Sequence, residues 1–297
     1  MGRIVDVRTE ATGHPRAPLV LRLAVVGGGA LLVWFGIGAL DGLLPGDPRS
    51  LTRHATNAVL TTVLATLLVV AARRWLDRRP LRGLGLWTES TALRDLALGA
   101  LTWLLPAGAG LALATAAGWV TLSVDGTALD VVRVVLLLVV LVLVLEAWPE
   151  ELVFRGYLHR NLEAAMAPWL AVAVQALFFT VFGTALWVAT AGWGVVVDRA
   201  VLFAGMGVVL GCIRLAAGSV WAPIGFHLVF QVVMQLVLGG RYLTVTPSDP
   251  DLFTLVTAGA AFAAGVPVAL WLWRGRDGWS WTRPEPDQPS HSRRSRP

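Results

Sequence analysis

The chain places side chains that can do acid–base chemistry at the end of a long apolar run. Glu146, Glu150 and Glu151 follow the stretch 131–145, in which one residue is charged, and Arg155 lies four residues after Glu151. That run is apolar enough to form most of a transmembrane helix. A charge that continues such a helix costs roughly 2.5–3.5 kcal/mol near the bilayer centre, so these residues indicate a buried functional site with partners elsewhere in the chain.

Helix geometry gives these side chains different directions. Arg155 is roughly 40° around the helix from Glu151, which predicts an ion pair between them, whereas Glu150 is roughly 100° away and keeps an unpaired carboxylate. Pro149 removes a backbone donor and can open the helix beside Glu150. The alternative is an ordinary interfacial helix end, because Glu150 lies roughly 28 Å along the helix from Val131, near the headgroups. Spacing alone leaves both interpretations open.

A second group of polar residues lies in a later apolar run. His227, Gln231 and Gln235 follow one another at intervals of four residues and therefore share one helix face. Counted from Val220, His227 lies roughly 10 Å deep, in the same half of the bilayer as Glu150. A lone membrane histidine is more commonly a helix–helix hydrogen-bonding residue than a ligand. Two polar groups at one depth favour a shared cavity, so we expect Glu150 and His227 to face each other.

The elements that must position these residues are membrane spans. The chain has 297 residues, of which 56% are hydrophobic and 14% charged, and its mean hydropathy is +0.68. An ordinary soluble domain is far less apolar. We expect an all-α polytopic membrane helix bundle with about eight transmembrane helices. The eight apolar segments are about 19–41, 56–72, 96–119, 131–157, 169–190, 199–214, 219–238 and 252–273.

Charge predicts the orientation of the bundle. The net charge is +5, and all 24 basic residues are arginines, which gather on one side if the N-terminus is cytoplasmic. We therefore predict an integral plasma or inner membrane protein with both termini cytoplasmic. Anionic lipid headgroups account for the basic stretches, so membrane lipids are expected partners and nucleic acid is not. The expected divisions are a cytoplasmic segment (1–18), one transmembrane bundle (19–273) and a disordered tail rich in Arg, Pro and Ser (274–297).

The motifs resemble one known family. The stretch 150–158 resembles the E-E-x-x-x-R first motif of the CPBP intramembrane endopeptidases, which include type II CAAX prenyl proteases and bacteriocin-related membrane proteins. The stretches 203–211 and 218–231 resemble the glycine-rich approach helix and the third motif of that family. The resemblance covers about residues 95–240.

The second motif of the family, F-x-x-x-H, is incomplete. Counting without gaps from Glu150 gives the stretch 179–183, which ends in Gly183, and a shift to 182–186 gives leucine at the histidine position. No histidine lies between His159 and His227. We predict that Gly183 leaves space in the cavity for a histidine ring. His159, two turns beyond Glu151, is predicted to lie on the surface.

The resemblance implies a role for each matching residue. In the family, the first glutamate and the second-motif histidine activate a water for attack on a peptide carbonyl, and the third-motif histidine and asparagine stabilise the oxyanion. Carried over, Glu150 is the general base, and Glu151 with Arg155 is its positioning pair. His227 and Gln231 are the oxyanion donors, with glutamine in place of the family's asparagine.

The resemblance also implies a metal, because a metal role has been assigned to these family groups. A divalent ion such as zinc would have Glu150 and His227 as its candidate ligands. A catalytic zinc needs about three protein ligands, so we predict no metal and no other cofactor. Glu146 shares a face with Glu150 and could supply a second carboxylate, but the sequence leaves its role open.

Two functions follow. The first is a hydrolase of the intramembrane metalloprotease family, a CAAX-processing endopeptidase in which a Glu150-activated water attacks a peptide bond in the cytoplasmic half of the membrane. The alternative is a catalytically inactive relative that acts as a membrane binding or immunity scaffold, which the missing histidine favours. The expected partner is a membrane-associated protein or peptide substrate. A prenylated tail, a leader peptide and a membrane-bound regulator are all compatible, and the oligomeric state stays open.

Overall fold

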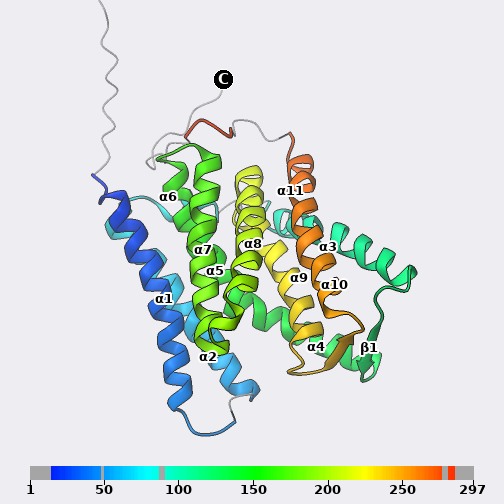
Figure 1. Ribbon diagram of the computed structural model, residues 1–297. Coiled ribbons are helices and arrows are strands. Elements are labelled where there is room, and N and C mark those ends of the chain that lie inside the picture. Colours follow the sequence, from blue (N-terminus) through cyan, green and yellow to red (C-terminus); the bar gives the residue numbers. More distant parts are fainter. Residues whose placement is uncertain (1–14, 48–49, 87–90, 276–279, 285–297) are drawn as a thin grey trace, which may run out of the picture.

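The protein is an all-α bundle, as predicted. The computed structural model describes residues 15–47, 50–86, 91–275 and 280–284. Eight helical spans in this part of the chain are long and apolar enough to cross a membrane (Figure 1). The spans are α1 (Leu19–Leu43); α2 (Leu51–Ala71) with η1 (Ala72–Asp77); α3 (Ala92–Ala116); α4 (Ala128–Val142) with its continuation to Glu163; α7 (Pro168–Ala191); η5 (Trp193–Val195) with α8 (Val196–Ala217); α9 (Trp221–Leu238); and α10 (Pro250–Thr254) with η6 (Leu255–Ala260) and α11 (Ala261–Leu272).

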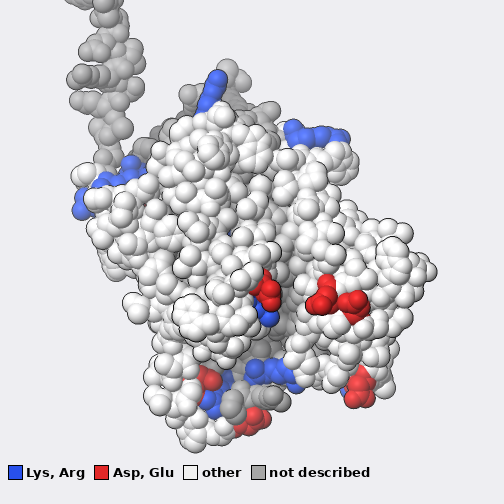
Figure 2. Space-filling view, in the orientation of Figure 1, with Lys and Arg blue, Asp and Glu red and all other residues white. Residues whose placement is uncertain are grey.

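The first span begins and the last span ends at the same end of the bundle. Helix α1 begins and α11 ends at the upper end in Figure 1, as an even number of crossings requires. On the face shown in Figure 2, the acidic side chains all lie in the lower half, whereas arginines lie both at the upper end and beside the acidic side chains in the lower half. The orientation of the bundle in the membrane stays a prediction.

A two-stranded sheet lies at the opposite end of the bundle. The apolar pattern of the sequence did not predict this sheet. Strand β1 (Leu122–Asp125) pairs antiparallel with β2 (Thr244–Pro247), so that Leu122 lies opposite Pro247. The sheet joins the loop after α3 to the loop after α9, two connections far apart in the sequence. Backbone pairing satisfies polar groups that would otherwise be exposed at the membrane surface.

Two glycines bring α3 and α9 into close contact. A Cβ atom built on Gly99 would overlap the backbone carbonyl of Ala222, and one on Gly225 would overlap that of Leu96. Small residues let membrane helices approach closely enough for backbone packing. This contact fixes the position of α9, the helix that carries His227.

We therefore expect Gly99→Ala to destabilise the protein by about 1–3 kcal/mol, because the added methyl group forces α3 and α9 apart. Gly108→Ala in the same helix is the control, since a Cβ there meets nothing within 4 Å among the described residues. Thermal unfolding of the purified proteins in detergent measures both. Equal melting temperatures for the two variants would contradict the predicted close contact.

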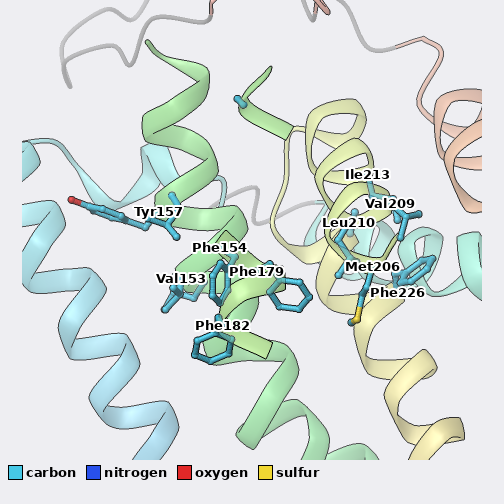
Figure 3. Packing of buried hydrophobic residues seen from close by; sticks show 14 of the residues in the cluster. Val153, Phe154, Tyr157, Phe179, Phe182, Met206, Val209, Leu210, Ile213 and Phe226 are labelled. Atoms are coloured by element: carbon cyan, nitrogen blue, oxygen red, sulfur yellow. The ribbon is translucent and has the colours of Figure 1, made fainter. Parts of the chain in front are cut away.

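Aromatic side chains pack the middle of the bundle. Phe154 lies with its ring centroid 5.0 Å from that of Phe179 and 5.0 Å from that of Phe182, both on α7 (Figure 3). Figure 3 shows a second group, contributed by α8 and by Phe226 of α9. The first group holds the middle of the 128–163 helix against α7.

A buried polar network ties three segments together near the end where α1 begins. Arg73 Nη1 lies 2.8 Å from Asp77 Oδ2, and Arg22 Nη1 lies 3.4 Å from Asp77 Oδ1. The Tyr157 hydroxyl and the Asn161 amide also donate to Asp77, at 3.0 and 3.2 Å. Arg22 donates in turn to Asn161. Asp77 thus accepts from α1, from η1 and from the 128–163 helix.

The predicted terminal segments lie mostly outside the described residues, which exclude 1–14, 276–279 and 285–297. Residues 280–284 of the tail are described. The Trp281 carbonyl accepts a hydrogen bond of 3.2 Å from the Trp169 amide, and its side chain packs against a small cluster formed by α7 and α8.

Candidate active site

One long helix carries the acidic residues, and its winding changes around them. After α4 come the π-helical η3 (Leu143–Ala147), α5 (Trp148–Glu151), the π-helical η4 (Leu152–Leu158) and α6 (His159–Glu163). Pro149 does not break the helix, because the residues on both sides keep helical backbone angles. The predicted opening takes the form of two wide turns, one on each side of α5. Such turns occur frequently at functional sites.

Two threonines of α2 hold the first wide turn. The Thr62 hydroxyl donates to the Val144 carbonyl within η3. The Trp148 indole donates to the Thr66 hydroxyl over 3.2 Å. Thr62 and Thr66 are one helical turn apart, so α2 fixes the register in which Glu146 and Glu150 are presented.

Glu151 is the fixed centre of the site. Its Oε1 lies 2.8 Å from Arg155 Nη1 and 2.9 Å from His227 Nδ1. All three side chains are buried. The expected pair of Glu151 and Arg155 is therefore present, and it also holds the histidine. A carboxylate only accepts, so Nδ1 carries the hydrogen and the ring orientation of His227 is set.

The free edge of the imidazole faces Glu150. His227 Nε2 lies 4.0 Å from Glu150 Oε2, which is longer than a direct hydrogen bond. The Glu150 side chain keeps 12% of its surface exposed, whereas that of Glu151 keeps none. The two spans thus bring Glu150 and His227 together, with Glu150 as the accessible carboxylate.

The polar face of α9 also contacts Glu146, through Gln235. Gln235 Nε2 donates to Glu146 Oε1 over 2.6 Å. His227 and Gln235 of α9 therefore face Glu150 and Glu146 of the 128–163 helix, and we call this line of facing side chains the polar seam. Gln231 lies between His227 and Gln235 on the same face of α9, and its role as an oxyanion donor stays a prediction.

Side chains of α7 and α8 hold Arg155 in place. The Arg155 guanidinium lies 4.3 Å from the centroid of the Phe179 ring, a cation–π contact. Arg214 Nε donates to the Arg155 carbonyl over 3.1 Å. Sequence reasoning missed both supports, because neither pair has a fixed spacing along the chain.

One comparison with known proteins places part of the chain in a family. Residues 132–233 match the family model described as type II CAAX prenyl endopeptidase Rce1-like. These residues form an Rce1-like domain. A comparison with curated proteins gives no match. The Rce1-like domain runs from α4 into α9 and contains all five predicted site residues, Glu150, Glu151, Arg155, His227 and Gln231. The family is one of CAAX-type proteases, and the resemblance stated from the motifs is confirmed.

The prediction that His159 lies on the surface is wrong. Its side chain is completely buried inside the Rce1-like domain, and neither ring nitrogen has a hydrogen-bond partner among the described residues. The apolar pattern placed the helix end near Tyr157, but the helix continues to Glu163 and stays buried over its last two turns.

The prediction that Gly183 leaves space for a histidine ring is also wrong. A Cβ atom at this position would lie 2.6 Å from Cδ1 of Phe203. Phe203 comes from α8 and meets Phe179 edge to face, with centroids 5.6 Å apart. In this Rce1-like domain an aromatic ring fills the volume beside position 183.

Gly183→His is therefore expected to destabilise the protein by about 1–3 kcal/mol, because the imidazole would overlap the Phe203 ring. The double variant Gly183→His/Phe203→Ala is expected to recover part of this loss, since it removes the overlapping ring. Thermal unfolding in detergent measures both variants. A single variant as stable as the wild type would show that the volume is open after all.

The donor set does not fit a metal centre. Within the part of the chain that the structure describes, no three His, Cys, Asp or Glu side chains are arranged to hold a metal ion. The candidate ligands Glu150 and His227 supply one carboxylate and one imidazole, and Oε1 of the neighbouring Glu151 accepts from Arg155 and His227. The mechanism below uses no metal, and its absence stays a prediction.

Proposed function

We propose that this protein is an intramembrane endopeptidase that hydrolyses a peptide bond of a membrane-associated substrate in the cytoplasmic half of the bilayer. One observation carries the proposal. An accessible carboxylate, Glu150, faces the Nε2 edge of an imidazole that the buried Glu151–Arg155 pair holds in place. This is the arrangement of a general base beside an oriented hydrogen-bonding group.

The gap between Glu150 and His227 suits hydrolysis. A distance of 4.0 Å can be bridged by one water molecule that contacts both side chains. Glu150 accepts one proton of that water as its oxygen bonds to the scissile carbonyl carbon. The proton then passes to the amide nitrogen as the C–N bond breaks, and Glu150 is regenerated.

Two side chains of α9 can stabilise the oxyanion. His227 donates to the developing negative charge when Nε2 carries a hydrogen, and its ring cannot turn away while Nδ1 is bonded to Glu151. Gln231 lies one helical turn after His227 on the same face of α9, and its side-chain amide can donate a hydrogen to the same oxyanion. Glu151 and Arg155 act as positioning residues.

The proposed substrate class follows from the Rce1-like match. Its description names CAAX prenyl endopeptidases, so a membrane-anchored peptide with a prenylated C-terminal CAAX sequence is the first substrate to test. A leader peptide and a membrane-bound regulator present the same kind of scissile bond at the same depth, and they complete the panel.

A second function has one observation in its favour. Phe203 fills the volume beside Gly183, where the family's second-motif histidine is expected. A site without that histidine can bind a peptide without cleaving it. The alternative is therefore a catalytically inactive membrane binding or immunity scaffold.

The deciding experiment is a cleavage assay with purified protein in liposomes. Wild type and Glu150→Ala are incubated with the peptide panel, and the products are mapped by mass spectrometry. Cleavage by the wild type that disappears in Glu150→Ala supports the endopeptidase. Binding of a peptide without cleavage supports the scaffold, and equal cleavage by both proteins contradicts the proposed base.

A further inference from the structure

We infer that Glu146 is a further catalytic residue, which takes the place of the missing second-motif histidine by holding the attacking water together with Glu150. This inference rests on the proposed function. It concerns a residue outside the E-E-x-x-x-R motif, four positions before Glu150.

The first observation is the fixed position of Glu146. It lies in the wide turn η3, whose Val144 carbonyl is bonded to Thr62 of α2. On the other side, Gln235 of α9 donates to its carboxylate over 2.6 Å. A carboxylate at this depth is costly unless it has a partner, and here a neutral amide donates to it. Glu146 is thus held in place by a neutral donor.

The second observation is the distribution of exposure along the seam. Glu151, Arg155 and His227 are buried, whereas Glu146 and Glu150 are partly exposed. Both of these carboxylates therefore keep some surface that water can reach, and the Glu151–Arg155 pair does not.

The third observation is proximity. Glu146 and Glu150 are four positions apart on one continuous helix, and both face α9: Gln235 donates to Glu146, and His227 Nε2 lies 4.0 Å from Glu150 Oε2. Glu146 therefore lies on the same side of its helix as the proposed base. Position 183 cannot supply a polar group, because it is glycine packed against Phe203.

The chemistry needs a second acceptor. A water that donates one hydrogen to Glu150 points its lone pair at the carbonyl carbon only if its other hydrogen is also held. Glu146 can accept that hydrogen on one carboxylate oxygen while Gln235 donates to the other. During hydrolysis Glu146 gains and loses no proton. The proton that leaves the water goes to Glu150 and then to the amine product.

The test compares variants of the full-length protein in the liposome assay. Glu146→Gln and Glu146→Ala are expected to lower kcat about 10–100-fold, the effect of one lost hydrogen bond to a charged group, with little change in KM. Added sodium formate is expected to restore part of the activity of Glu146→Ala, because it supplies a carboxylate at the partly exposed position of Glu146. Asp251→Ala removes an exposed carboxylate elsewhere and is expected to change neither kcat nor the response to formate.

The outcomes separate the inference from the proposed function. If Glu150→Ala is inactive and both Glu146 variants keep the wild-type kcat, the inference is wrong and the endopeptidase stands. If activity falls without rescue by formate and the melting temperature falls with it, Glu146 has a structural role and the inference is overturned. If the wild type shows no Glu150-dependent cleavage, the inference and the proposed function fail together.

Discussion

Glu150→Gln is expected to lower kcat for peptide cleavage about 10²–10⁴-fold, the usual contribution of a general base. The amide has the shape of the carboxylate but cannot take a proton from water. Stability should be unchanged, because Glu150 is partly exposed and its contact with His227, at 4.0 Å, is too long for a hydrogen bond. Steady-state kinetics and thermal unfolding of the same preparation measure the two quantities.

The neighbouring glutamate provides the contrast. Glu151→Gln is expected to lower both activity and melting temperature, because Oε1 of Glu151 accepts hydrogen bonds from both Arg155 and His227. Removing the charge leaves a buried guanidinium without its counter-ion. If Glu150→Gln unfolded at a lower temperature while Glu151→Gln behaved like the wild type, the assignment of base and positioning residue would be reversed.

Asp77→Ala is expected to destabilise the protein by about 3–5 kcal/mol, because it leaves two buried arginines without their shared carboxylate. Arg73 and Asp77 are completely buried, and Arg22 is nearly so. The same change removes acceptors from Tyr157 and Asn161. Lower yield of folded protein and a lower melting temperature in detergent would show the effect.

Two milder variants calibrate this result. Tyr157→Phe removes one hydrogen bond to Asp77 and is expected to cost about 1 kcal/mol. Asp41→Ala breaks an ion pair with Arg53 that is more exposed, and it is expected to cost about 1 kcal/mol or less. A loss for Asp77→Ala no larger than these would mean that the network contributes little to stability.

The sequence by itself determined the spans and the members of the site. Apolar length is a local property, so each of the eight helices followed from the composition of its own segment. The pair of Glu151 and Arg155 could be predicted because their spacing keeps them on one helix face. The meeting of Glu150 and His227 followed from depth, since an unpaired charge in a membrane requires a partner at its own level.

The tertiary structure alone decided which side chains meet laterally. His159 is buried because its helix continues past the apolar run to Glu163 and packs against α7. The volume beside Gly183 is decided by Phe203, which lies on another helix and has no spacing that marks it. The pairing of Gln235 with Glu146 depends on the wide turn η3, which changes the angle between residues that an ideal helix would fix. Depth in the membrane can be read along one segment, but rotation about each helix axis is set by packing against its neighbours.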